Sequence, residues 1–286
     1  AIALSINTFI NWLLITGNLG FPALGVKGAA AATLIARIFE FSALLIFIYK
    51  DECHPLAGTL KELTSWDFKM LINILRTSLP VILSETAWSI GTSVYFIAYG
   101  YIGSYAIAVV QISYSISDFF QAIFFGVGSA CAVMIGNELG KNNYDQAVEC
   151  SRKFVKLTLV LSIIFSTLLF LFKGYITQFF NLTSETNYYL DKTLIVFCIF
   201  FTPKMFTYMF ICGILRAGGD TKFCMIVEII SIWLIGVPMS FISVLILKLP
   251  IHLVVASVFV EEAIKMLITI NRYKSRKWIN NLITAP

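Results

Sequence analysis

Residues 223–247 read FCMIVEIISIWLIGVPMSFISVLIL, and Glu228 is the only charged residue among them. An α-helix needs about 20 mainly apolar residues to cross about 30 Å of hydrocarbon, so this stretch predicts a transmembrane helix. The rest of the chain has the same character, because 58% of its 286 residues are hydrophobic and 13% are charged. A soluble domain carries about 25% charged residues. These proportions exclude an ordinary soluble protein and predict an all-α polytopic membrane protein.

Apolar stretches of this kind recur along the chain and predict eight transmembrane helices. They are residues 2–16, 28–49, 78–99, 105–134, 157–172, 193–215, 223–247 and 251–270. The first is short and has neither an initiator Met nor a charged flank before it. A signal peptide would show a basic leader and a cleavage site. We therefore expect an N-terminally truncated piece of a longer protein.

Lysines and arginines alternate between the two sides of the predicted helices. The connections after the second, fourth, sixth and eighth helices carry fourteen, the alternate connections carry four, and three lie inside helices. An excess of Lys and Arg marks the cytoplasmic side. The pattern predicts a multi-pass protein of the cell (plasma or inner) membrane with both ends cytoplasmic. The net charge of +5 is then explained by attraction of these loops to anionic lipid, and no nucleic-acid partner is expected.

A weak internal repeat links the two ends of the chain. Residues 11–17 (NWLLITG) resemble residues 232–236 (IWLIG), and Trp12 precedes Glu40 by the same 28 positions that separate Trp233 from Glu261. Parallel repeats of this kind occur in transporters, where the substrate path runs between the two halves. If helices three to eight form the second half, helices one and two end the first. Four helices would then precede residue 1.

Charged groups inside the predicted helices are costly and need a partner or a function. Arg37 and Glu40, and likewise Glu261 and Lys265, stand three or four residues apart and can pair on one helix face. Glu85, Asp118 and Glu228 have no cation within one helical turn. Lys204 follows Pro203, where a broken helix would free carbonyl groups for its ammonium. The three acids and Lys204 are therefore candidate site residues.

Polar side chains form two stripes at helical spacing around two of these acids. Each stripe combines groups that bind a cation with an aromatic neighbour. The first stripe contains Glu85, Ser89 and Thr92 beside Trp88, and the second contains Gln111, Ser115 and Asp118 beside Tyr114 and Gln121. If both face one cavity, they could hold a cation. The alternative is that they form structural hydrogen bonds between helices, worth about 0.6 kcal/mol each.

Several segments together resemble the multidrug and toxic-compound extrusion (MATE) family of bacterial type, over nearly the whole chain. The segments occur in the order and with the spacing of that family. They are Asn7 and Asn11 with residues 24–33, Leu79-Pro80 with Tyr99, Gly100 and Gly103, residues 136–142, residues 213–221, and Trp233 to Pro238. Asn137 stands where the family usually has Gln, and the tenth helix carries Lys204 without a clear counterpart of the family's Asp.

The resemblance implies a two-lobe, twelve-helix transporter of the MOP superfamily. It divides the chain into the last two helices of the N-terminal lobe (1–50), a cytoplasmic linker (51–77), the six-helix C-terminal lobe (78–272) and a basic cytoplasmic tail (273–286). It further implies a multidrug efflux antiporter that exports organic cations or amphiphilic xenobiotics in exchange for H⁺ or Na⁺ by alternating access. Glu85 matches, by helix, the essential glutamate of members whose coupling site lies in the C-terminal lobe.

The partners we expect are a small organic cation or amphiphilic drug and the lipid bilayer, with the protein a monomer. No metal site, cofactor or enzymatic activity is expected, because the helices lack a Ser/His, paired Asp or metal constellation. A lipid-linked oligosaccharide flippase of the same superfamily and a non-transporting structural subunit remain as alternatives. The flippase would need a wide basic cavity. A structural subunit would leave the presence of unpaired acids inside the helices unexplained.

Overall fold

The computed structural model describes residues 2–50, 57–59, 65, 67–180 and 182–280, and they are almost entirely helical. Parts of the predicted linker (51–56, 60–64 and 66) and of the predicted tail (281–286) lie outside the described residues. The chain forms two compact units, residues 1–71 and 72–286. The prediction of an all-helical polytopic protein is confirmed by the elements within each unit.

The first unit is a helical hairpin of α1 (Ile2–Thr16) and α2 (Val26–Lys50). The connection, residues 17–25, includes the short helix η1 (Asn18–Gly20). Gly28 is required where the helices meet, because a Cβ there would lie 2.8 Å from the carbonyl carbon of Leu14. The predicted pair of Arg37 and Glu40 is present at 2.6 Å, on an exposed face of α2.

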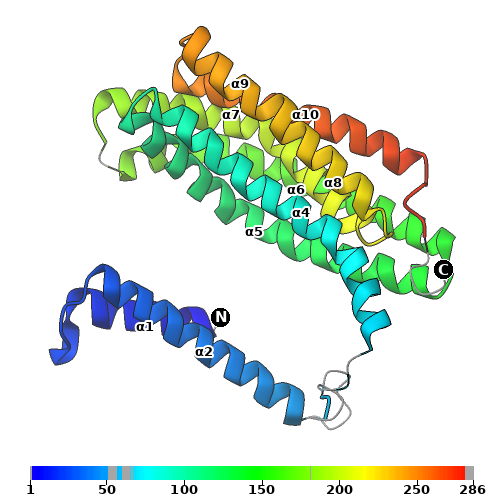
Figure 1. The fold of residues 1–286 in the computed structure, drawn as a ribbon. Coiled ribbons are helices and arrows are strands. Elements are labelled where there is room, and N and C mark those ends of the chain that lie inside the picture. Colours follow the sequence, from blue (N-terminus) through cyan, green and yellow to red (C-terminus); the bar gives the residue numbers. More distant parts are fainter. Residues whose placement is uncertain (1, 51–56, 60–64, 66, 181, 281–286) are drawn as a thin grey trace. The chain divides into compact units, whose positions relative to one another are not determined.

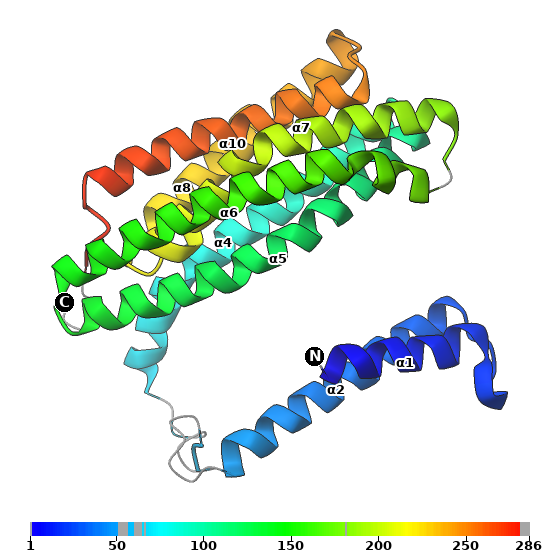
Figure 2. The same cartoon turned by 180° about the vertical axis from the view of Figure 1, so that it is seen from behind.

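The second unit is a bundle of long helices that run roughly along one another (Figures 1 and 2). Its elements are α4 (Phe68–Gly100), α5 (Ser104–Gly140), α6 (Tyr144–Phe179), α7 (Ser184–Tyr208) with η2 (Met209–Leu215), α8 (Thr221–Ile230) continued by η3 (Ser231–Gly236), α9 (Val237–Phe241) and η4 (Ile242–Ile246), and α10 (Ile251–Lys274). Helix α7 packs against α5, α6 and α10, and so forms the centre of the bundle.

Six helical segments of the described chain are long and apolar enough to cross a membrane. The two predicted spans outside this group are α1, which has only 15 residues, and α10, which carries three charges in its middle. α5 and α6 extend well beyond the predicted spans at 37 and 36 residues. At 1.5 Å per residue each is over about 50 Å long, so their ends project beyond about 30 Å of hydrocarbon.

The seventh and sixth predicted spans depart from regular α-helix. The seventh span is one continuous helix that contains π-helical turns at η3 and η4. The sixth span ends in the π-helical turns of η2. Turns of this type recur at functional sites in helices. Gly236, at the end of η3, brings its backbone against the Tyr95 hydroxyl and the Glu261 carboxylate, where a Cβ would not fit.

The core of the second unit runs along the length of the bundle. One cluster surrounds Tyr95, Tyr99 and Phe197, a second surrounds Cys131, Ile214 and Trp278, and a small aromatic cluster of Phe124, Phe201 and Met205 lies on the α5–α7 contact. Between these apolar layers lie the charged side chains described next.

Candidate functional site

A cavity of about 220 Å³ lies inside the second unit and is lined from five helical segments. Its wall combines carboxylates, ammonium groups and aromatic rings. The lining residues are Glu85 and Trp88 from α4, Gln121 and Phe125 from α5, Lys204, Thr207, Tyr208, Ile211 and Cys212 from α7 and η2, Glu228 from α8, and Glu262 and Lys265 from α10. Four predicted site residues therefore share one cavity: Glu85, Trp88, Lys204 and Glu228.

Arg216, the residue after η2, neutralises two of the three acids predicted to be unpaired. Its Nη1 donates to Glu85 Oε1 at 2.6 Å, and its Nη2 donates to Glu228 Oε2 at 2.9 Å. The Arg216 side chain is only 15% exposed, although it follows directly after the predicted helix 193–215. The prediction that Glu85 and Glu228 have no cationic partner is thus wrong. Both partners of Arg216 lie on other helices, so helical spacing in the sequence does not predict these pairs.

The two carboxylates differ in their access to solvent. The Glu85 side chain is 55% exposed, whereas that of Glu228 is 14% exposed. Arg216 therefore holds one buried and one accessible acid, and Glu228 does not extend into solvent as its place near the helix start would allow. If Glu85 is protonated or binds a cation, Arg216 still has Glu228 as a buried partner.

A second ionic network occupies the middle of α10. Lys265 pairs with Glu262 at 2.7 Å and, as the helical spacing predicted, with Glu261 at 3.4 Å. The Tyr95 hydroxyl of α4 donates to the other oxygen of Glu261 at 2.7 Å. Glu261 and Lys265 are buried, and Glu262 and Lys265 reach the cavity wall. Two carboxylates thus share a single ammonium group in a largely dry environment.

Lys204 joins the cavity to the second predicted stripe. Its ammonium lies 5.5 Å from the centre of the Tyr114 ring, a cation–π contact. It also interacts electrostatically with Glu262 and Asp118. The expectation that Pro203 breaks the helix to free carbonyls for Lys204 is wrong, because α7 continues through Pro203. The Pro203 carbonyl instead accepts a hydrogen bond from the Thr207 hydroxyl at 3.0 Å.

The remaining candidate residues lie outside this cavity. Gln111, Ser115 and Asp118 are exposed along α5, with Ser115 bonded to the Gln111 carbonyl at 2.9 Å. Ser89 is exposed on α4, and Thr92 is half-buried with its hydroxyl bonded to the Ser89 carbonyl at 2.9 Å. Among the described residues, Asp118 has no ion pair within 4 Å. The cavity therefore takes Glu85 and Trp88 from the first stripe and only Gln121 from the second.

The polar wall of the cavity includes one buried atom without a hydrogen-bond partner. Gln121 Oε1 is buried and unbonded among the described residues, and it belongs to a residue that lines the cavity. Such an orphaned atom is uncommon in folded proteins and calls for an explanation, a ligand group or water among them. One acceptor thus remains available beside the carboxylates. The cavity is chemically suited to a group that carries positive charge and has polar and flat apolar surfaces.

Comparison with known proteins places this bundle in a family of membrane transporters. The family model described as MatE matches residues 80–242, which is more than half of the chain. The chain therefore belongs to the MATE family.

Relatives and solved structures agree with this assignment. The chain is 26% identical over 275 residues to the "Uncharacterized transporter YisQ" of Bacillus subtilis, covering 94% of this chain and 58% of that protein. It is 25% identical over 239 residues to the "Probable multidrug resistance protein YoeA" of the same organism, covering 83% and 51%. It thus spans little more than half the length of these relatives.

Among solved structures, the chain resembles a MATE protein in complex with MaL6, with a TM-score of 0.82, 19% identity, and coverage of 99% of this chain and 63% of that one. It also resembles an outward-facing multidrug resistance MATE transporter of the MOP superfamily, with a TM-score of 0.79, 19% identity, and coverage of 100% and 63%. These likenesses establish the shared fold, and the predicted fold class is confirmed.

Proposed function

We propose that this chain is the main part of a multidrug efflux antiporter that exports organic cations or amphiphilic xenobiotics in exchange for H⁺ or Na⁺. The observation that carries the proposal is the cavity in which Glu85, Glu228 and Glu262 converge with Trp88, Phe125 and Tyr208. Carboxylates supply the charge that an organic cation needs, and aromatic faces supply cation–π contact and apolar area.

Glu85 is the residue we propose for coupling. It is the most accessible acid of the ionic cluster, and Arg216 shares its guanidinium between Glu85 and Glu228. Loss of the charge on Glu85 therefore leaves Arg216 paired and the helices held together. A proton, Na⁺ or organic cation can displace Arg216 from Glu85 at a smaller free-energy cost than from a carboxylate that is its only partner, because Arg216 keeps its bond to Glu228. Differential binding of this kind shifts the population between two states, as alternating access requires.

The charges around the cavity favour a cationic cargo over an anionic one. Lys265 and Arg216 are each bonded to two carboxylates, and Lys204 lies near Glu262 and Asp118. A flippase for a lipid-linked oligosaccharide needs several cations free to bind phosphate, whereas Lys204 is the only described lining cation of this cavity without an ion pair within 4 Å. In the orientation we propose, the connections rich in Lys and Arg lie on the cytoplasmic side of the cell membrane.

The test is efflux of a fluorescent organic cation from cells that express the full-length protein containing this chain. We expect Glu85→Gln to lose ion-coupled efflux while it keeps its expression level and thermal unfolding temperature. The matched control is Glu149→Gln, an exposed acid paired with Lys153 at 2.8 Å on the surface of α6, which we expect to transport normally. Repeating the assay with and without Na⁺ at fixed pH identifies the coupling ion. Unchanged coupled efflux in Glu85→Gln would reject the assignment.

A further inference from the structure

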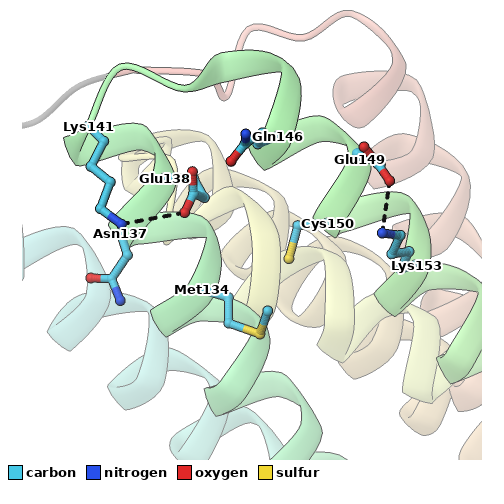
Figure 3. A pocket seen from close by; sticks show the side chains of 8 residues that line it. All are labelled: Met134, Asn137, Glu138, Lys141, Gln146, Glu149, Cys150 and Lys153. Carbon is cyan, nitrogen blue, oxygen red and sulfur yellow. Dashed lines mark ion pairs between the residues drawn. The ribbon is translucent and has the colours of Figure 1, made fainter.

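Two further clefts lie at the end of the bundle where α5 turns into α6 and α10 ends, and their charges differ. The first has a volume of about 410 Å³. Figure 3 shows the side chains that line it, which come from the end of α5, the turn after it and the start of α6. Its two lysines are neutralised by acids of their own helices: Lys153 pairs with Glu149 at 2.8 Å and Lys141 with Glu138 at 3.7 Å (Figure 3). This cleft therefore has little net charge to attract a ligand.

The second cleft, of about 290 Å³, lies between the start of α6 and the end of α10 and has a rigid aromatic floor. It is lined by Val148, Arg152, Tyr273, Lys274, Arg276 and Trp278. The Tyr273 hydroxyl bonds to Ser151 Oγ at 2.9 Å and so ties α10 to α6. The Trp278 ring stacks on Tyr273 with centroids 5.9 Å apart and planes 13° apart. Trp278 is wholly buried, so the floor of the cleft is part of the core.

Three cations line this basic cleft, and no acid lines it. Among the described residues, Arg152, Lys274 and Arg276 have no ion pair within 4 Å, whereas the nearby Arg272 is paired with Asp220 at 2.6 Å. Arg276 is held in the left-handed region at φ 56°, by a turn in which its amide donates to the Tyr273 carbonyl at 3.1 Å. The three like charges repel one another across the cleft, and a bound anion removes that repulsion.

The position of the basic cleft relative to the membrane points to the source of the anion. Arg152 lies at the third turn of α6, whose length makes its ends project from the hydrocarbon, and Lys274 is the last residue of α10. Tyr side chains such as the half-buried Tyr273 favour the headgroup level of a bilayer. Basic pockets between helices at that level bind the headgroups of anionic lipids.

We propose that the basic cleft binds the phosphate of an anionic phospholipid headgroup. The planar guanidinium groups of Arg152 and Arg276 suit phosphate oxygens, Lys274 adds a point charge, and the half-buried Tyr273 ring, backed by Trp278, faces the glycerol and upper acyl carbons. This site is separate from the cavity around Glu85, and it stands whether or not the protein exports drugs.

The experiment is native mass spectrometry of the purified chain in detergent, titrated with phosphatidylglycerol and, separately, with phosphatidylcholine. We expect one phosphatidylglycerol to be retained in preference to phosphatidylcholine. The variant R152Q/K274Q/R276Q should retain it at least about tenfold more weakly, since it removes the three charges that attract the headgroup. The matched control R76Q/K156Q/K222Q removes three exposed basic residues outside the cleft and should bind like the parent.

Three outcomes would overturn the proposal. Equal weakening in both triple variants would assign the lipid to general attraction by the basic end of the bundle. Equal retention of the two lipids would remove the role of charge. Displacement of phosphatidylglycerol by inorganic phosphate at matched concentration would make the cleft a site for free phosphate. Should the triple variant unfold, the single reversal Lys274→Glu, on an exposed side chain, replaces it with the same expected direction.

Discussion

At the scale of single residues, the ionic side chains divide by how far apart their partners lie in sequence. The pairs Arg37–Glu40 and Glu261–Lys265 could be predicted, because helical spacing alone brings them together. The pairing of Arg216 with Glu85 could not, because these residues are 131 positions apart and only the packing of α4 against the end of η2 joins them. The sequence thus indicates Glu85 and Glu228 as acids of the site, but neither Glu262 nor Arg216, the cation that Glu85 and Glu228 share, was predicted.

The buried ammonium of Lys265 gives a sharp test of the α10 network. Lys265→Met removes the only cation bonded to Glu261 and Glu262 in the described structure. Breaking a buried ion pair by removing one partner costs about 3–5 kcal/mol, because a charge is left uncompensated. We expect a loss of that size in the free energy of unfolding, measured in detergent micelles.

Two variants control this prediction. Lys153→Met breaks a pair whose side chains are 74% and 67% exposed, and it should change stability by no more than about 0.5 kcal/mol. Adding Glu262→Gln to Lys265→Met removes one of the stranded carboxylates and should recover part of the loss. Equal effects of Lys265→Met and Lys153→Met would contradict the description of Lys265 as a buried partner.

Gly236 offers a steric test of the same network. A methyl group at this position collides with the Tyr95 hydroxyl and the Glu261 carboxylate, so Gly236→Ala must displace these two side chains and disturb the hydrogen bond between them. Overpacking of this kind costs about 1–3 kcal/mol. Gly126→Ala, in α5, meets no atom within 4 Å and should be neutral or slightly stabilising, since alanine favours helix. Thermal unfolding of both variants decides the matter, and equal unfolding temperatures would refute the predicted clash.

At the scale of elements, apolar length predicted which segments are helical but not where the helices end. α5 and α6 continue through polar residues beyond the apolar stretches, because short turns between antiparallel helices leave no other place for these residues. The π-helical turns of η2 and η3 were not predictable either. η2 carries Ile211 and Cys212 of the cavity wall, and η3 ends at Gly236 against Tyr95, and periodicity in one helix does not encode either contact.

The residues after α10 form an element that composition alone described as a basic tail. Residues 275–280 instead fold back, with Trp278 wholly buried and Asn280 Nδ2 bonded to the Gly218 carbonyl at 3.1 Å. Arg272 adds two hydrogen bonds to Asp220, at 2.6 and 3.0 Å. The segment therefore fastens the end of α10 to the turn that follows Arg216.

Removing the Trp278 ring should release this fastening. We expect Trp278→Ala to lower the free energy of unfolding by about 3–5 kcal/mol, the usual cost of deleting a fully buried large aromatic side chain. Trp233→Ala, at a tryptophan that is 36% exposed, is the matched control and should cost less. Limited proteolysis after residue 274 reports the release directly, and an unchanged cleavage rate in Trp278→Ala would speak against the fastening.

At the scale of the whole molecule, the candidate site lies entirely within the second unit. Every residue of the cavity and of both ionic networks falls between residues 72 and 286. The MatE match over residues 80–242 also lies in this unit. The chain spans little more than half the length of its curated relatives, so transport is a property to be measured on the full-length protein. Ligand binding to the cavity can instead be measured on the chain itself.

The orientation of the bundle in the membrane follows from where its cations lie, and reporter fusions can test it. Ten of the sixteen basic residues of the second unit lie in the turn after α5 with the first half of α6, in the turn after η2 with the start of α8, and at the end of α10. The turn after η4 carries Lys248 alone. Because excess Lys and Arg stay in the cytoplasm, alkaline phosphatase fused after Lys141 or Lys274 should be inactive in a Gram-negative host. The same enzyme fused after Lys248 should be active, since it folds only when exported to the oxidising side. A fluorescent protein should show the reverse pattern at the same three positions. Activity of the phosphatase after Lys141 and Lys274, with none after Lys248, would invert the bundle and move the basic cleft to the outer leaflet.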